Sequence, residues 1–137
     1  MSEGDFSGGV EWCENPKSRV SYHYIIAPSG ANYQLVDLEN TAWHAGLIRD
    51  PQTDFVKHGP NPNLYSVGIA MAGFAIDGPN AKQISECARL LHEIAGKYGI
   101  TLDKNTVIPH HAIRADKICP GLKVSIDTLI YLGSLPQ

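Results

Sequence analysis

A histidine and a cysteine late in the chain have the types and the spacing of metal ligands. His111 and Cys119 lie 119 − 111 = 8 positions apart on a short polar segment that ends in Pro-Gly. Imidazole and thiolate are ligands that zinc prefers, and a loop of this length can bring both to one ion. Because a zinc site normally needs three or four protein donors, two interpretations stay open: a zinc site, or a loop histidine beside a packed cysteine.

Two further side chains are candidates for catalysis beside such an ion. Lys117 lies between the two candidate ligands, where its ammonium could stabilise the oxyanion formed when water attacks a carbonyl; a surface lysine is the alternative. Tyr22 lies on an expected strand, where its phenol could orient or deprotonate the water; a packed tyrosine is the alternative. His110 is expected beside the site or in solvent, since neighbouring side chains on an extended segment point apart.

Trp43 and His44 form a second candidate cluster, followed by two small residues. An indole and an imidazole at this place could line a groove that admits a sugar-peptide chain, and a purely structural histidine is the alternative for His44. His23 follows Tyr22 on the expected strand, so it faces the opposite side and is expected to pack.

Local signals predict the elements that must hold these residues. The clearest is a helix over about residues 81–98, with Asn80 as N-cap, Gln83 completing a capping box and Gly99 ending it. Shorter helices are expected over 7–14 and 126–132, strands over 21–26, 31–36, 66–73 and 106–108, and a long surface loop over 48–64. The apolar 66–73 strand is expected at the centre of the sheet. This mixture predicts an α/β fold, one domain over residues 1–137 with a mixed β-sheet flanked by helices.

Composition excludes several classes of function. The 137 residues carry a net charge of −3 with no basic run, which argues against nucleic-acid binding. No stretch is apolar for long enough to insert into a membrane, and the first residues do not form a signal peptide, so we expect a protein that is cytoplasmic as synthesised. Three cysteines do not indicate a disulfide framework, and Cys87 on the apolar helix face is expected in the core.

Taken together, these segments resemble the type 2 N-acetylmuramoyl-L-alanine amidases, which include phage endolysin amidases and the peptidoglycan recognition proteins. The matching stretches follow the family's order within about residues 5–130, and they are 20–26, 33–36, 42–46, 66–69 and 111–121. The resemblance implies a zinc-dependent hydrolase that acts on peptidoglycan or muropeptides. It would cut the amide between N-acetylmuramic acid and L-alanine, and would reach the cell wall once released.

The resemblance also implies roles for single residues. Carried over by position, His111 and Cys119 correspond to the second and third zinc ligands, Lys117 to the lysine that stabilises the oxyanion, and Tyr22 to the catalytic tyrosine of the phage enzymes. His44 matches a residue of the substrate cleft, and Trp43 is expected to line the same cleft. Some relatives have a glutamate where this chain has Ala70, which favours the version of the mechanism that uses tyrosine and lysine.

One departure from the family concerns the first zinc ligand. In the family, this histidine ends an early strand about two dozen residues before the position of Tyr22, and that position precedes Met1 here. Three explanations are open: a segment upstream of Met1, a form that binds peptidoglycan without cutting it, or a third donor such as His44, His23 or a substrate oxygen. Without that strand the sheet would expose apolar surface, which a homodimer could cover.

Overall fold

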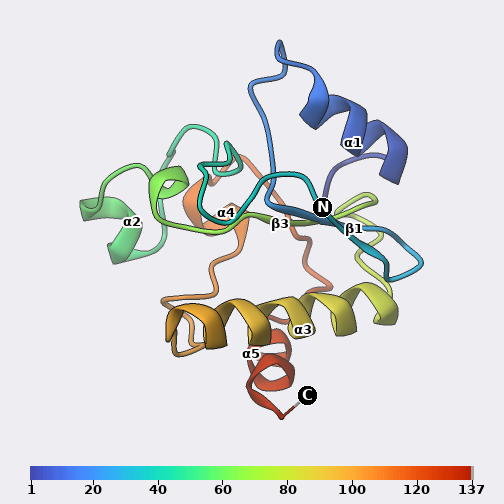
Figure 1. Cartoon of the computed structure of the whole chain (residues 1–137). Coiled ribbons are helices and arrows are strands. Elements are labelled where there is room, and N and C mark those ends of the chain that lie inside the picture. Colours follow the sequence, from blue (N-terminus) through green and yellow to red (C-terminus); the bar gives the residue numbers. More distant parts are fainter. Residues whose placement is uncertain (137) are drawn as a thin grey trace.

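The computed structural model describes residues 1–136, which form a three-stranded mixed sheet between helices (Figure 1). The strand order is β2-β1-β3: β2 (Asn32–Gln34) pairs antiparallel with β1 (Tyr24–Ile26), and β3 (Ile69–Met71) pairs parallel with it. Helix α1 (Phe6–Glu14) lies on one side of the sheet and α3 (Ala81–Tyr98) on the other, with α5 (Ile126–Ser134) packed against α3. The predicted α/β fold with a mixed sheet flanked by helices is confirmed.

Helix α3 has the ends that the sequence predicts. The Asn80 side chain accepts the Gln83 N–H, and the Gln83 side chain accepts the Asn80 N–H, both at 3.1 Å. Gly99 ends the helix in the left-handed conformation at φ 65°, which glycine adopts without strain. Between these ends Cys87 is buried in the core as predicted. The long helix α3 therefore has defined ends and packs against one face of the sheet.

The strand predicted at the centre of the sheet lies at its edge. β1 is central, and the outer side of β3 pairs instead with the start of the chain: Ser2 N–H donates to Met71 O, and Glu3 N–H donates to Gly73 O, both at 3.0 Å. β3 is apolar because helices and the N-terminal residues cover it, a packing that its sequence cannot distinguish from strand pairing on both sides. The homodimer expected to cover exposed sheet surface stays a prediction.

Three other expectations change in detail. The 21–26 strand shortens to β1, because Gly68 O accepts the N–H groups of both His23 and Tyr24 and so interrupts a regular ladder. Residues 106–108 form no strand, because the N–H groups of Thr106 and Val107 donate to Asp103 O and close a turn. The predicted 48–64 loop contains a short helix α2 (Asp54–His58) and a 3-10 turn η1 (Pro62–Leu64). Within residues 1–136 no helix is both long and apolar enough to cross a bilayer.

Candidate active site

His111, one of the two predicted ligands, is hydrogen-bonded to the backbone carbonyl of the other, Cys119. The segment begins with a short helix α4 (His110–Ile113) rather than in the extended form that we expected. Both the backbone N–H and ring Nδ1 of His111 lie 3.0 Å from Cys119 O. Since a carbonyl oxygen can only accept, Nδ1 carries a hydrogen, which in the neutral ring leaves the lone pair on Nε2. This is how proteins orient a metal-ligating histidine.

The cysteine end of the loop is fixed against the sheet. Gly121 has φ 100°, and a Cβ there would lie 2.2 Å from Ala75 O, so only glycine allows this close approach. Cys119 is 8% exposed, and its thiol lies 3.8 Å from Glu3 Oε1, which also accepts the Ala75 N–H at 3.0 Å. The structure therefore places a carboxylate that we did not predict beside Cys119.

The described residues do not make a complete zinc site. Within residues 1–136 no group of three or more His, Cys, Asp or Glu side chains is placed to hold a metal ion. His23 is no third donor, contrary to one expectation: it is 1% exposed, its Nε2 donates to Asn40 O, and its Nδ1 accepts the Gly68 N–H. His23 packs, as also predicted. His111 and Cys119 thus offer two donors, fewer than a structural or catalytic zinc normally takes.

Tyr22 lies next to this pair with its phenol protonated. Burial, with smaller electrostatic effects of the nearby Cys13, Cys119 and Glu3, raises the pKa of Tyr22 to about 12. At neutral pH the hydroxyl therefore keeps its proton and can donate a hydrogen bond. Of the two roles that the sequence leaves open, the raised pKa favours the orientation of a reacting group. Tyr22 and Cys119 both line a cleft of about 690 Å³.

Lys117 is exposed in the loop that follows α4. The neighbouring Asp116 is not available to pair with it, because its carboxylate accepts from Nε and a terminal nitrogen of Arg114, each at 2.9 Å. Among residues 1–136 Lys117 forms no ion pair. Burial lowers the pKa of His110, whose Nε2 donates to Ala45 O, and the positive charge of Lys117 lowers it further. The lysine is thus an unpaired cation near the histidine segment.

Trp43 and His44, predicted to line one groove, point to different surroundings. The Trp43 side chain is 51% exposed, whereas the His44 ring is mostly buried and lines the same cleft as Tyr22. The ring packs on Gly68, where any Cβ would lie 2.3 Å from it. Asn63 fixes the turn, because its side-chain oxygen accepts the N–H groups of His44 and Ala45 at 2.9 and 2.8 Å.

The buried state of His44 predicts that the protein loses stability in mild acid. Burial lowers the pKa of His44 from 6.5 to about 4, so below pH 6.5 the unfolded chain binds more protons than the folded one. Stability is therefore lost as the pH falls from 6.5 towards 4. We expect denaturant titrations to give a free energy of unfolding about 2 kcal/mol lower at pH 5 than at pH 7. His44→Gln should show a clearly smaller loss, and an equal loss would contradict this assignment.

Two residues of the site were missed by sequence reasoning. Asn63 is 4% exposed, although it lies within the segment expected to be a surface loop. The Asn61-Pro62-Asn63 run predicts a turn, but it does not indicate that the Asn63 side chain binds the backbone of His44 and Ala45. Glu3 has φ 57°, which is unfavourable for a residue other than glycine, and nothing in the sequence indicates that its carboxylate reaches Cys119.

Comparisons with known proteins show the family and the fold of this chain. The N-acetylmuramoyl-L-alanine amidase family matches residues 2–122. N-acetylmuramoyl-L-alanine amidase A of Achromobacter lyticus is 34% identical over 101 residues, which cover 72% of this chain and 49% of that protein. The chain therefore spans about half the length of that curated relative.

The fold is that of the amidase AmiD from E. coli, which was solved with the substrate anhydro-N-acetylmuramic acid-L-Ala-D-γ-Glu-L-Lys. The TM-score is 0.80 and the identity is 22%, over 96% of this chain and 54% of AmiD. It also matches AmpD, with a TM-score of 0.70 and 23% identity over 93% of this chain and 70% of AmpD.

Proposed function

Because this chain belongs to the N-acetylmuramoyl-L-alanine amidase family, we propose that it hydrolyses the amide between the lactyl group of N-acetylmuramic acid and L-alanine in peptidoglycan. The observation that carries the proposal is the convergence of Tyr22 and Cys119 on one cleft, with His111 hydrogen-bonded to the Cys119 carbonyl. These are the residues that the sequence indicated, and they come from segments almost a hundred positions apart. A muropeptide of the kind bound to AmiD is the expected class of substrate.

The chain's own residues supply two parts of such a reaction. The protonated phenol of Tyr22 would orient the attacking water or the scissile carbonyl by donating a hydrogen bond. The unpaired ammonium of Lys117 would stabilise the negative charge that develops on the carbonyl oxygen as the tetrahedral intermediate forms. In that role an exposed lysine needs no partner in the free protein.

The proposal includes zinc dependence, but the described side chains supply fewer donors than a zinc site needs. His111 and Cys119 would be two of the ligands, and a complete site needs at least one further donor that the side chains of residues 1–136 do not supply. The small number of zinc donors favours a second candidate function, in which the domain binds muropeptides and does not cut them. Both functions would use the cleft that Tyr22 and Cys119 line, and they differ in whether the amide is broken.

Identification of the reaction products separates the two functions. The protein would be incubated with a purified N-acetylmuramoyl peptide in zinc-supplemented buffer, and the products would be examined by mass spectrometry. We expect free N-acetylmuramic acid and a stem peptide that begins with L-alanine, with the peptide's own amide bonds intact. Cleavage at another bond would contradict the proposal, and an intact ligand that nevertheless binds would identify the binding module.

Removing the hydroxyl of Tyr22 should slow the reaction and leave the fold intact. Tyr22→Phe keeps the packed ring and deletes the donor, so we expect turnover to fall by roughly a hundredfold. Because burial raises the pKa of Tyr22 to about 12, ionisation of this group should add no feature to the pH profile between pH 6 and 10. Rates of stem-peptide release, measured across that range, test both statements. Turnover within twofold of the unsubstituted protein would rule out this role.

A further inference from the structure

Three charged side chains meet in the turn that follows α4, directly before the exposed Lys117. Both oxygens of the Asp116 carboxylate accept hydrogen bonds from Arg114, one from Nε and one from a terminal nitrogen, each at 2.9 Å. One of these oxygens also lies 3.7 Å from a terminal nitrogen of Arg49. The Arg114 side chain is 24% exposed, so this two-bond pair is partly shielded from water and is stronger than a fully exposed ion pair.

The Arg114 side chain lies against the segment that follows His44. Gly46 has φ 66°, and a Cβ there would lie 3.0 Å from a terminal nitrogen of Arg114, so the guanidinium packs against a residue without a side chain. The backbones are joined as well, because Ala115 N–H donates to Arg49 O at 3.0 Å. These contacts give Arg114 a defined position that does not depend on Asp116 alone.

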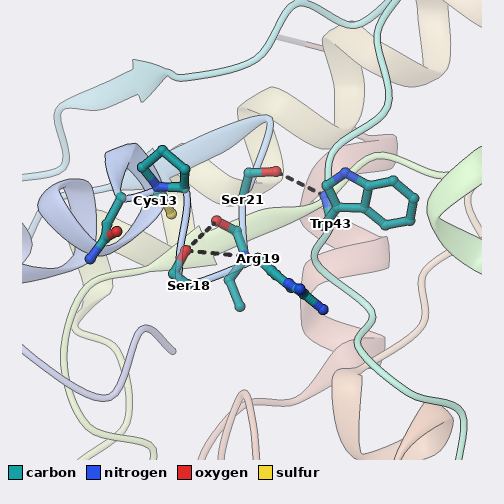
Figure 2. Close-up of a pocket in the computed structure, with 8 residues that line it drawn as sticks. Cys13, Ser18, Arg19, Ser21 and Trp43 are labelled. Carbon is teal, nitrogen blue, oxygen red and sulfur yellow. Dashed lines mark hydrogen bonds between the residues drawn. The ribbon is translucent and has the colours of Figure 1, made fainter.

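The segment that Arg114 contacts is itself anchored on two sides. Ser21 N–H donates to Trp43 O at 3.1 Å, and Trp43 N–H donates to the Ser21 hydroxyl at 2.9 Å (Figure 2). On the other side, His110 Nε2 donates to Ala45 O at 3.0 Å. The guanidinium of Arg114 is therefore fixed to a backbone that borders both the ligand loop and the residues before β1.

The same turn places Asp116 next to Lys117. Lys117 N–H donates to Arg114 O at 3.0 Å, which closes a four-residue turn with Asp116 at its third position. The lysine side chain is long and exposed, so its ammonium could reach the neighbouring carboxylate if that carboxylate were free. An ion pair of this kind would neutralise the charge that the proposed reaction needs on Lys117.

We propose that Arg114 is a positioning residue for the reaction: by holding both oxygens of Asp116, it keeps this carboxylate away from Lys117 and leaves the ammonium free for the oxyanion. Arg49 adds a second positive charge on the same carboxylate. This inference rests on the proposed function, because it assumes that Lys117 meets a developing negative charge.

Removing first the guanidinium and then the carboxylate tests this role. At low ionic strength and saturating zinc, Arg114→Gln should lower turnover about tenfold, because Asp116 is released beside Lys117. Adding Asp116→Asn to Arg114→Gln should restore turnover to within about twofold, since the amide carries no charge. On a Lys117→Ala background, Arg114→Gln should have little further effect, because no ammonium remains to be neutralised. Initial rates of stem-peptide release would measure all of these variants.

Arg89→Gln is the matched control. Arg89 also binds both oxygens of one carboxylate, that of Glu86, through Nε at 3.0 Å and a terminal nitrogen at 2.7 Å, but it lies on α3. We expect its turnover to equal that of the unsubstituted protein, because loss of such a pair on this helix changes no charge near Lys117.

Several results would overturn the inference. One is an Arg114→Gln rate within twofold of the Arg89→Gln rate. Another is a slow Arg114→Gln protein that Asp116→Asn does not restore, because that pattern indicates a structural role for the arginine. Asp116→Asn alone should keep turnover within about twofold, and a tenfold loss would overturn the inference even if Arg114→Gln failed to fold. In these cases the proposed function would stand, since the unsubstituted protein cuts the amide. No cleavage by the unsubstituted protein would overturn the inference and the proposed function together.

Discussion

Replacing Cys119 with serine should lower the affinity for zinc by more than about a hundredfold, because changes that only touch the neighbours of a ligand already cost 10–100-fold. The serine keeps the size of the side chain and removes the thiolate. Cys119 is 8% exposed and its carbonyl oxygen still accepts from His111 in the variant, so the loop should keep its shape. Competition titrations with a chromogenic chelator would measure the dissociation constants.

Cys13→Ser is the matched control for this change. Cys13 is partly buried and lies near Tyr22, but it belongs to α1 and not to the ligand loop. We expect its zinc affinity to match that of the unsubstituted protein within about threefold. If both variants lost zinc to the same extent, the effect would reflect general destabilisation, and Cys119 would not be a ligand.

Replacing Lys117 with alanine should lower the rate of amide cleavage by roughly a hundredfold or more at saturating zinc. Removing one preformed group that stabilises an oxyanion typically costs 10²–10³ in turnover, about 3–4 kcal/mol. The lysine is exposed and forms no ion pair among residues 1–136, so folding and zinc affinity should not change. Initial rates of stem-peptide release, with denaturant midpoints for both proteins, check the two statements.

Lys104→Ala provides the comparison for Lys117→Ala. Its side chain is also exposed, but it pairs with Asp127 at 3.0 Å on a different part of the surface. We expect full activity, because an exposed pair of this kind contributes little. A Lys117→Ala rate within a few-fold of the Lys104→Ala rate would show that this ammonium does not stabilise the oxyanion.

The features that sequence reasoning predicted correctly depend on neighbours along the chain. The ends of α3 follow from Asn80, Gln83 and Gly99, which act within one or two helical turns. The hydrogen bonds from His111 to Cys119 O are made within the eight-residue span that suggests the pair, and the role of both residues as zinc ligands stays a prediction. The fold class followed from the same local signals, and it was strengthened by the ordered resemblance.

The features that sequence reasoning missed depend on contacts between distant segments. β3 is as apolar as a central strand because the N-terminal residues and the helices cover it, so hydrophobicity could not show that it lies at the edge. Glu3 reaches Cys119 from 116 positions away, and no local pattern encodes such a contact. The prediction that Trp43 and His44 line one groove treats them as neighbours, although successive side chains of an extended segment face opposite ways.

The dependence of cleavage on free zinc tests the central claim most directly. The rate at which N-acetylmuramoyl-L-alanine amide is cut would be measured over a series of buffered zinc concentrations, with and without a chelator. We expect a rate that rises with zinc, saturates and disappears in the chelator, with weak zinc binding because residues 1–136 supply two donors. A cleavage rate that does not change with zinc would contradict the assignment of His111 and Cys119 to a hydrolytic site. The absence of cleavage at every zinc concentration, in a protein that still binds the muropeptide, would contradict it as well.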